Sequence, residues 1–425
     1  MSILIKTPFK PNKLETDPLV YGLRPEIIRA CITELYNDKS ILITGGRGIG
    51  KSSLCYQLQR ILGGEKILLE RCVMDINLDK CITVMFVCSP YDTLETIVDG
   101  IMAELEKKLV DVNKNFKLKE ATAEFSFLGS LKVSAKVENA EKNTYMSLID
   151  NFIDTMRRFG ETYVNPHINI AIDELDLISE KENIAHFIKV VLEKMSSVEE
   201  NFLSFILVGQ ELLFNRLYGQ QPAFHRIVKH IKLYPLNIEN AEYVFDACLN
   251  RADTKVLINN EAKKLLLDIA GGYPATIQLL GHEAFNCSLE KYDTIPEYIN
   301  IDMTDMIEGI KNTLIAETMR FQTVLESLTG EEQACILTLA DEAQTDVPFV
   351  YTIENLMGGV LGSDYEEKEK KSKPILDGLI DKQILYYIED DLGVVNTQRK
   401  ISFREELFRI YLNDKLNNSS RLDYI

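Results

Sequence analysis

The segment from Ile41 to Leu54, ILITGGRGIGKSSL, constrains the fold more than any other part of the sequence. An apolar run leads into a glycine-rich turn, and a lysine and two serines then begin a predicted helix. The turn matches the pattern G-x-x-x-x-G-K-[ST], in which main-chain N–H groups surround phosphate oxygens and the lysine contacts the β- and γ-phosphates. A strand, a phosphate-binding loop and a helix in this order predict a nucleotide-binding α/β domain.

The nucleotide contacts predicted from this pattern are contiguous in the sequence. Glycine has no Cβ atom, so the main chain can approach the phosphates closely, and the following helix directs its N-terminus at the same anion. We expect the hydroxyl of Ser52 to bind Mg²⁺ beside the phosphates of ATP. The predicted nucleotide-binding residues are Gly45, Gly46, Arg47, Gly48, Ile49, Gly50, Lys51, Ser52 and Ser53.

A second apolar strand ends in carboxylates, in the sequence INIAIDELDLI from Ile168 to Ile178. Asp173, at the end of the apolar run, is predicted to hold Mg²⁺ either directly or through water. The next residue, Glu174, is suited to polarise a water molecule for attack on the γ-phosphate. An acidic surface loop has the same sequence pattern, but the phosphate-binding loop upstream favours the catalytic interpretation.

Apolar strands alternate with helices up to about residue 236, which predicts a parallel sheet covered by helices on both faces. After Pro235 the pattern becomes all helical, and from about residue 321 the order helix, helix and hairpin predicts a winged-helix-like domain. The expected parts are an extended N-terminal arm (1–20), a nucleotide-binding domain (21–236) with a β-hairpin insert at about 124–138, a helical lid (237–318) and the winged-helix-like domain (319–418).

The composition excludes several classes of protein. The net charge is −18, whereas a dedicated nucleic-acid binder carries a basic surface, so DNA binding is disfavoured. The eight cysteines include no CxxC pair and the five histidines show no metal spacing, so we expect neither a disulfide framework nor a zinc site. With no membrane-spanning apolar run and no secretion signal in the sequence, a cytoplasmic protein is expected.

The sequence resembles the AAA+ ATPases, in particular the bacterial and archaeal branch related to origin-recognition initiators, transposition-regulator ATPases and STAND signalling ATPases. The resemblance is carried by GGRGIGKSSL, IAIDEL, ILVGQELL, AFHRIVKHIKLYPL, AGGYPATIQLLG and SFREELFRIYL, in this order along the chain. It implies a P-loop NTPase fold with a helical lid, and ATP and Mg²⁺ as cofactors. It also implies that the opening segment PFKPN…VYGLRPEI packs near the adenine.

The resemblance implies roles for further polar residues. Gln210 occupies the sensor-1 place, near the γ-phosphate and the attacking water. Arg226 matches the arginine finger, which contacts the γ-phosphate of a neighbouring subunit, and Arg216 is the competing candidate. The sensor-2 region, GGYPATIQLL, departs from the family because Ala275 and Thr276 stand where an arginine is expected. A slowly hydrolysing switch is therefore expected rather than a fast motor.

Two functions remain open from the sequence. In the first, ATP bound between subunits of a homo-oligomer closes a ring or filament that regulates a protein partner; the resemblance implies a setting in mobile elements or anti-phage defence. In the second, the protein is an initiator or loader that grips duplex DNA with its winged helix and hairpin insert. The expected wing tip, IEDDLG, is acidic and would repel phosphate, which favours the first function.

Overall fold

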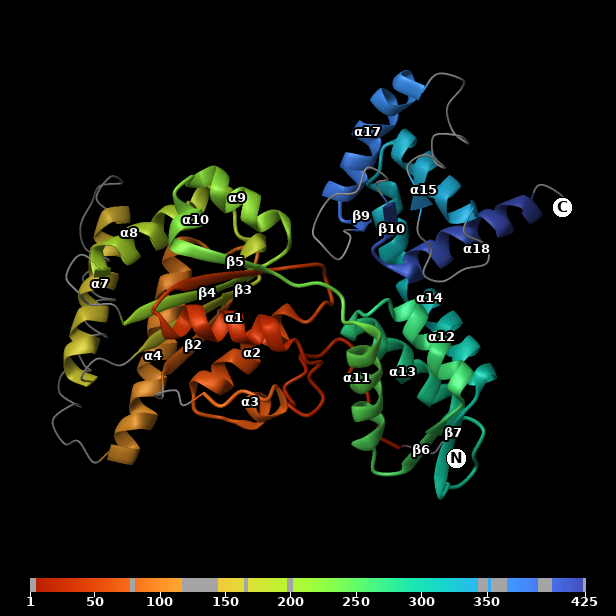
Figure 1. The fold of residues 1–425 in the computed structure, drawn as a ribbon, viewed down its shortest axis with the longest axis horizontal. Helices are drawn as coiled ribbons and strands as arrows, with labels where there is room; N and C mark the ends of the chain where they lie inside the picture. The colour runs from red at the N-terminus through yellow and green to blue at the C-terminus, as the bar shows by residue number, and fades with distance from the viewer. Residues whose placement is uncertain are drawn as a thin grey trace. The chain divides into compact units, whose positions relative to one another are not determined.

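The structure is a computed structural model. It describes residues 5–76, 81–116, 144–163, 167–196, 202–342, 351–352, 365–388 and 400–422. The chain forms two compact units (Figure 1). One unit is Thr16–Tyr234, and the other combines Met1–Glu15 with Pro235–Ile425, so the chain passes between the two units twice.

A five-stranded parallel sheet forms the centre of the unit Thr16–Tyr234 (Figure 1). Its strand order is β2-β3-β4-β1-β5. Every residue of β1, β3 and β4 is buried, which means that both faces of the sheet are covered. The predicted fold class, a P-loop NTPase sheet with helices on both faces, is confirmed. The strands are β1 (Ser40–Thr44), β2 (Ile82–Val87), β3 (Ile168–Asp173), β4 (Leu203–Gly209) and β5 (Val228–Lys232).

Helices connect these strands and complete the core. The apolar faces of α4, α7 and α8 pack with the sheet, and the rings of Phe152 and Phe187 meet edge to face at 5.5 Å. Thr93 caps α4, since its hydroxyl accepts a hydrogen bond from the main-chain N–H of Thr96. The predicted hairpin at 124–138 lies outside the described residues. The helices are α1 (Pro25–Tyr36), α2 (Lys51–Leu62), α3 (Ile67–Arg71), α4 (Leu94–Phe116), α7 (Thr144–Tyr163), α8 (Ile184–Ser196), α9 (Leu212–Gln220) and α10 (Phe224–Ile227).

The second unit begins with a lid of four helices and a small sheet. The lid helices are α11 (Ile238–Asn250), α12 (Asn260–Ala270), α13 (Pro274–Leu289) and α14 (Met303–Glu326). The prediction of helices alone after Pro235 was wrong, because β6 (Lys255–Ile258) pairs in parallel with β7 (Tyr298–Ile301). Each of these strands has four residues, too few for their alternating burial to stand out beside the long helical segments.

Residues 5–15 of the predicted N-terminal arm pack with this lid, whereas residues 16–20 belong to the nucleotide-binding unit. The ring of Phe9 is 2% exposed and lies 5.6 Å from the ring of Phe245. It also covers Gly281, where a Cβ atom would come within 2.3 Å of the Phe9 ring. The guanidinium of Arg251 donates a hydrogen bond to the carbonyl of Pro8, 243 residues away in the sequence. Residues of the N-terminal arm and of the middle of the chain therefore build the lid together.

A small mixed domain ends the second unit. Its three-stranded antiparallel sheet has the order β8-β10-β9. The segment between β9 and β10 contains the predicted acidic wing tip and lies outside the described residues, so the wing stays a prediction. The elements are α15 (Gly330–Glu342), β8 (Tyr351–Thr352), α17 (Tyr365–Asp381), β9 (Leu385–Ile388), β10 (Lys400–Phe403) and α18 (Glu406–Leu422).

Two further observations concern the chain as a whole. Helix α14 runs without a break across the predicted domain boundary between residues 318 and 319. Within the described part of the chain, no helix has both the length and the apolar character needed to span a membrane.

Candidate active site

The phosphate-binding loop joins β1 to α2 at the carboxyl edge of the sheet. Gly48 and Gly50 have φ angles of 77° and 97°, in the left-handed region that favours glycine. A Cβ atom on Gly45 would lie 3.0 Å from the carbonyl oxygen of Leu233. Gly50 also forms the N-terminal boundary of α2, so the free N–H groups of this helix belong to the loop. The predicted loop therefore has the cradle shape that phosphate binding requires.

Arg24 anchors this loop from the segment that precedes α1. Its guanidinium is 8% exposed and donates hydrogen bonds to the carbonyl of Ile49 at 2.9 Å and to the carbonyl of Tyr234 at 3.3 Å. The Ile49 side chain is buried, whereas Arg47 is exposed. Sequence reasoning did not single out Arg24, although an arginine immediately before Pro25 and inside VYGLRPEI was a visible signal. Arg24 holds the loop in shape from outside the motif.

Lys51 lies on the loop and among carboxylates. Its ammonium donates a hydrogen bond to the carbonyl of Gly46 at 3.0 Å. Burial lowers the pKa of Lys51, and the negative charges of Asp176, Asp173 and Glu174 act in the opposite direction. The lysine charge thus lies close to the acidic residues that follow β3, as the predicted ATP site requires.

The order of the strands brings the other predicted residues to the same edge. Strand β4 lies between β3 and β1, so Gln210, which follows β4, lies between Asp173 at the end of β3 and the phosphate-binding loop after β1. Ligands of open parallel α/β sheets bind at this carboxyl edge. Three separate sequence segments therefore converge as predicted.

The two carboxylates after β3 differ in environment. Asp173 is 3% exposed, and its Oδ1 atom accepts a hydrogen bond from the N–H of Glu174 at 2.8 Å. Glu174 is exposed and has φ 55° and ψ 35°, a left-handed conformation that costs a non-glycine residue about 1–3 kcal/mol. Such strain persists where the surrounding structure imposes it, and it is found at active sites.

The donor set at this edge suits Mg²⁺. The described residues contain no group of three or more His, Cys, Asp or Glu side chains that could hold a metal ion by themselves. Mg²⁺ in nucleotide sites is typically bound by one or two carboxylates, a hydroxyl and the substrate phosphates. Asp173 and Ser52 fit this pattern, and Ser52 lies in the first turn of α2.

The two arginine-finger candidates are in different situations. The guanidinium of Arg216 donates three hydrogen bonds to main-chain carbonyls of its own chain. Arg226, on the short helix α10, is exposed, and its side chain makes no hydrogen bond or ion pair with the residues that the structure describes. Of these two guanidinium groups, that of Arg226 is available to another molecule.

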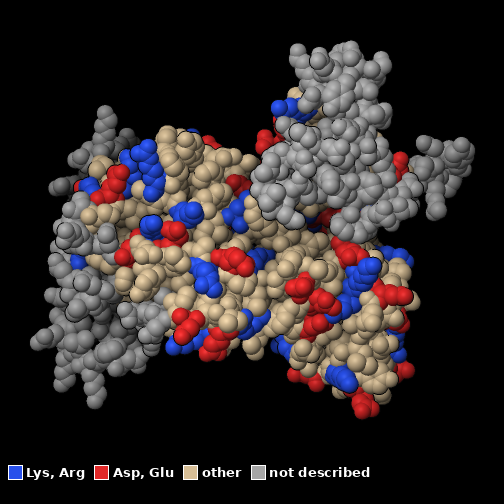
Figure 2. All heavy atoms as spheres, viewed as in Figure 1, with Lys and Arg blue, Asp and Glu red and all other residues tan. Residues whose placement is uncertain are grey.

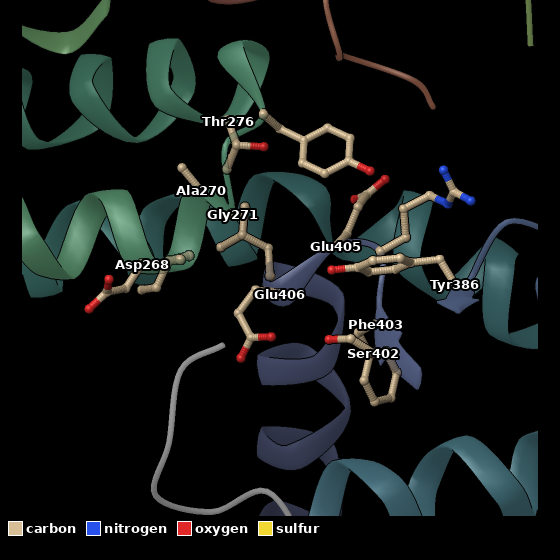
Figure 3. Close-up of a pocket in the computed structure, with 13 residues that line it drawn as sticks. Asp268, Ala270, Gly271, Thr276, Tyr386, Ser402, Phe403, Glu405 and Glu406 are labelled. Atoms are coloured by element: carbon tan, nitrogen blue, oxygen red, sulfur yellow. The ribbon is translucent and has the colours of Figure 1, made fainter. Parts of the chain in front are cut away.

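The lid has no cation at the sensor-2 place. Helix α13 begins with Pro274, and Ala275 and Thr276 follow. Thr276 lines a cavity of about 40 Å³ in its own unit, together with Tyr386 and Glu405 (Figure 3). This volume holds about three water molecules, so the cavity is far too small for a nucleotide.

The surface charges are mixed in the view of Figure 2. Lysine and arginine side chains alternate with aspartate and glutamate side chains over both units, and the residues drawn in colour on this face form no continuous basic patch. Phosphate backbones bind to basic surfaces. This face therefore offers no evident track for a nucleic acid.

Comparison with known proteins agrees with this site. Residues 34–217 match the AAA domain family, a span that contains the phosphate-binding loop, Asp173, Glu174 and Gln210. The chain therefore contains an AAA domain, that is, a P-loop ATPase domain. A search of curated proteins finds no match to the sequence.

Solved structures show the same fold over nearly the whole chain. The Walker-type ATPase PABY2304 of Pyrococcus abyssi is 14% identical, with a TM-score of 0.55 over 94% of this chain and 98% of that chain. The Aeropyrum pernix ORC2 protein, in ADPNP–ADP complexes, is also 14% identical, with a TM-score of 0.55 over 99% of each chain. The predicted resemblance to the AAA+ P-loop ATPases is thus confirmed by the match to the AAA domain family, and the similarity to these two structures shows a shared fold.

Proposed function

We propose that this protein is an ATP-driven switch that binds ATP with Mg²⁺, hydrolyses it slowly and assembles with copies of itself. The observation that carries the proposal is the convergence of Asp173, Glu174 and Gln210 with the phosphate-binding loop at one edge of the sheet. Adjacent carboxylates at such a strand end suit ATP hydrolysis, because one can hold Mg²⁺ and the other can polarise the attacking water.

Binding uses the loop and the start of α2. Main-chain N–H groups of residues 45–53 donate hydrogen bonds to the phosphates. Lys51 gives up its hydrogen bond to the Gly46 carbonyl and contacts the β- and γ-phosphates instead. Ser52 and Asp173 would hold Mg²⁺, which neutralises phosphate charge when it is bound. Arg24 keeps the loop in shape through its hydrogen bond to Ile49.

Hydrolysis uses the residues after β3 and β4. The carboxylate of Glu174 accepts the proton of the attacking water, and the side-chain amide of Gln210 orients that water beside the γ-phosphate. The lid contributes no cation at Ala275 or Thr276, so one element of charge stabilisation is missing. A slow rate follows, which suits a switch.

Assembly supplies the remaining positive charge. The exposed guanidinium of Arg226 has no partner among the described residues and acts as a finger on the γ-phosphate of a neighbouring subunit. Contacts of this head-to-tail kind build rings or filaments. The ATP-bound assembly then presents a surface to a protein effector, in a mobile-element or anti-phage defence setting such as the family resemblance implies.

The test is the mass of the Glu174→Gln variant measured by light scattering, with and without ATP and Mg²⁺ and with and without duplex DNA. This variant should bind ATP and accumulate as an oligomer with ATP alone, because the water is no longer activated. The ATPase rate of Arg226→Ala should be roughly 10³-fold below that of the wild-type protein. Lys229→Ala, an exposed control on the neighbouring strand, should keep the wild-type rate. A monomer under every condition would contradict the proposal.

A DNA initiator or loader is the second candidate. The observation that favours it is the similarity of fold to the Aeropyrum pernix ORC2 protein over 99% of both chains. Against it stand the net charge of −18 and the mixed charges of the residues drawn in colour on the face shown in Figure 2. A mass increase that requires DNA would support this candidate instead.

A further inference from the structure

Four hydrogen bonds join the loop after β3 to the segment after β4, one to the turn at Gln210 and three to helix α9. The Nη1 atom of Arg216 donates to the carbonyls of Asp176 and Ile178, both at 3.0 Å, and its Nη2 atom donates to the carbonyl of Leu175 at 2.6 Å. In the opposite direction, the Oδ1 atom of Asp176 accepts a hydrogen bond from the main-chain N–H of Gln210 at 3.0 Å. We call Asp176 and Arg216 together the brace.

The surroundings of the brace show that its parts fit one another. A Cβ atom on Gly209 would come within 2.8 Å of the Asp176 carboxylate, so glycine at the end of β4 leaves room for that carboxylate. Burial lowers the pKa of Arg216, and among the described residues its side chain forms no ion pair within 4.0 Å. A cation held by three carbonyls rather than by a carboxylate is fixed in direction as well as in place.

The brace holds the two sides of the predicted reaction centre. On one side is Glu174, in its left-handed conformation, whose carbonyl accepts the N–H of Leu177 at 3.0 Å. On the other side is Gln210, which leads into α9, the helix that carries Arg216. The only direct side-chain link from this loop to Gln210 that the described residues show is the Asp176 carboxylate.

We propose that Asp176 and Arg216 are positioning residues that fix the Glu174 carboxylate relative to Gln210, so that one water molecule contacts both side chains. This inference rests on the proposed function. It assigns Arg216 a role inside its own subunit, which removes it as a candidate finger. Misplacing a reacting group by about 1 Å can lower a rate by roughly 10²-fold.

The test compares hydrolysis with nucleotide binding in four variants of the full chain. Arg216→Met keeps an unbranched chain in place of the aliphatic part of the side chain but loses its donors, and Asp176→Ala loses the acceptor. Each should lower kcat about 10–100-fold, while the Kd for ADP changes less than about threefold. Asp176→Asn keeps an oxygen acceptor and should retain kcat within about threefold. Arg29→Met, on the exposed face of α1, is the matched control and should behave as the wild type.

The double variant Arg216→Met/Asp176→Ala should be no slower than the slower single variant, since the two residues act as one unit. Unchanged kcat in both single variants, even with a lower Tm, would overturn the inference by leaving the brace a purely structural role. Loss of activity in Asp176→Asn equal to that in Asp176→Ala would also overturn it, because charge rather than the hydrogen bond would then matter. If Arg216→Met does not fold, the comparison of Asp176→Ala with Asp176→Asn tests the inference by itself.

The same assays separate this inference from the proposed function. Wild-type protein that binds no ADP, or that hydrolyses no ATP at any protein concentration, would overturn both. Hydrolysis that is lost in Glu174→Gln but unaffected in the brace variants would overturn the inference and leave the proposed function standing.

Discussion

The turn before α2 and the turn before α13 are built from the same parts. Each contains two glycines in the left-handed region, Gly48 and Gly50 in the first and Gly271 and Gly272 in the second. Each leads directly into a helix, but the second helix begins with Pro274, which has no N–H group. A comparison of the glycine φ angles alone would give both turns the same capacity to bind an anion.

Their side chains differ completely. The first turn is followed by Lys51 and Ser52 and lies at a strand edge that carries the carboxylates of β3. The second is followed by Pro274, Ala275 and Thr276 and lines a cavity of about 40 Å³. The comparison teaches that a glycine turn and a helix N-terminus give the shape of a phosphate site, while the following side chains and the neighbouring strand ends decide whether it is one.

The largest expected effect is at the first turn. Lys51→Ala should weaken ADP binding at least about 100-fold, because a desolvated cation that contacts the β-phosphate is removed. Isothermal titration calorimetry measures this directly. Lys66→Ala, an exposed lysine in the same unit, is the control and should bind ADP as the wild type does. Equal affinity in the two variants would mean that the first turn is no more a nucleotide site than the second.

Substitutions in the second turn should change the stability of the protein rather than its nucleotide binding. A Cβ atom on Gly272 would lie 2.2 Å from the carbonyl oxygen of Leu236, whereas one on Gly271 would meet no atom within 4 Å. Gly272→Ala should therefore destabilise the lid by about 3 kcal/mol, and Gly271→Ala by about 1 kcal/mol, which reflects backbone conformation alone. Thermal unfolding monitored by circular dichroism checks the order, and an equal Tm for both variants would contradict the packing described.

A smaller effect on the free energy of unfolding is expected when pH changes the protonation of His230, at the base of the first turn. The Nε2 atom of His230 lies 2.7 Å from the hydroxyl of Thr44, the last residue of β1. Burial, together with the charge of Lys232, lowers the pKa of His230 below its usual 6.5. The unfolded chain therefore binds more protons than the folded one between the folded pKa and 6.5, so the free energy of unfolding rises with pH across that window and falls on acidification.

His230→Gln should flatten this dependence while His225→Gln, at an exposed position, should leave it unchanged. Denaturant unfolding from about pH 5 to about pH 7 measures the slope for each protein. A slope that is unchanged in His230→Gln would show that other groups dominate the acid response of the first turn.

The smallest effect is expected at the sensor-2 place. Thr276→Ala should change kcat and the Kd for ADP by less than about twofold, since this side chain carries no charge and faces a cavity of its own unit. A steady-state ATPase assay is sufficient. A tenfold change in kcat would show that the start of α13 takes part in catalysis. The two turns would then differ only in how much each contributes to the rate.

Features encoded by local spacing were predictable from the sequence. The phosphate-binding loop, Asp173 and Glu174 follow apolar runs directly, and these runs form the strands Ser40–Thr44 and Ile168–Asp173. Local patterns are informative here because one strand or one helix supplies the whole signal. The roles assigned to Gln210 and Arg226 come from family resemblance and stay predictions.

Features that depend on distant partners were not predictable in this way. Arg216 donates a hydrogen bond to the carbonyl of Leu175, 41 residues away in the sequence, and Arg24 donates one to the carbonyl of Tyr234, 210 residues away. Sequence periodicity does not indicate either contact. The β6–β7 pair was missed for a related reason, since each strand is short and its partner lies about 40 residues away. The sequence indicates which residues suit chemistry, and the fold decides which of them are held in place.

The docking of the N-terminal arm on the lid has a consequence for synthesis of the protein. Pro8 leaves the ribosome 243 residues before its partner Arg251, an interval of about 12–50 s at ordinary rates of translation. During this interval the residues of the nucleotide-binding unit are made, while Phe9 lacks the aromatic partner and the glycine surface that later bury it. The residues of the arm are thus made well before the part of the lid that buries them, and the lid is completed only when the arm packs onto it.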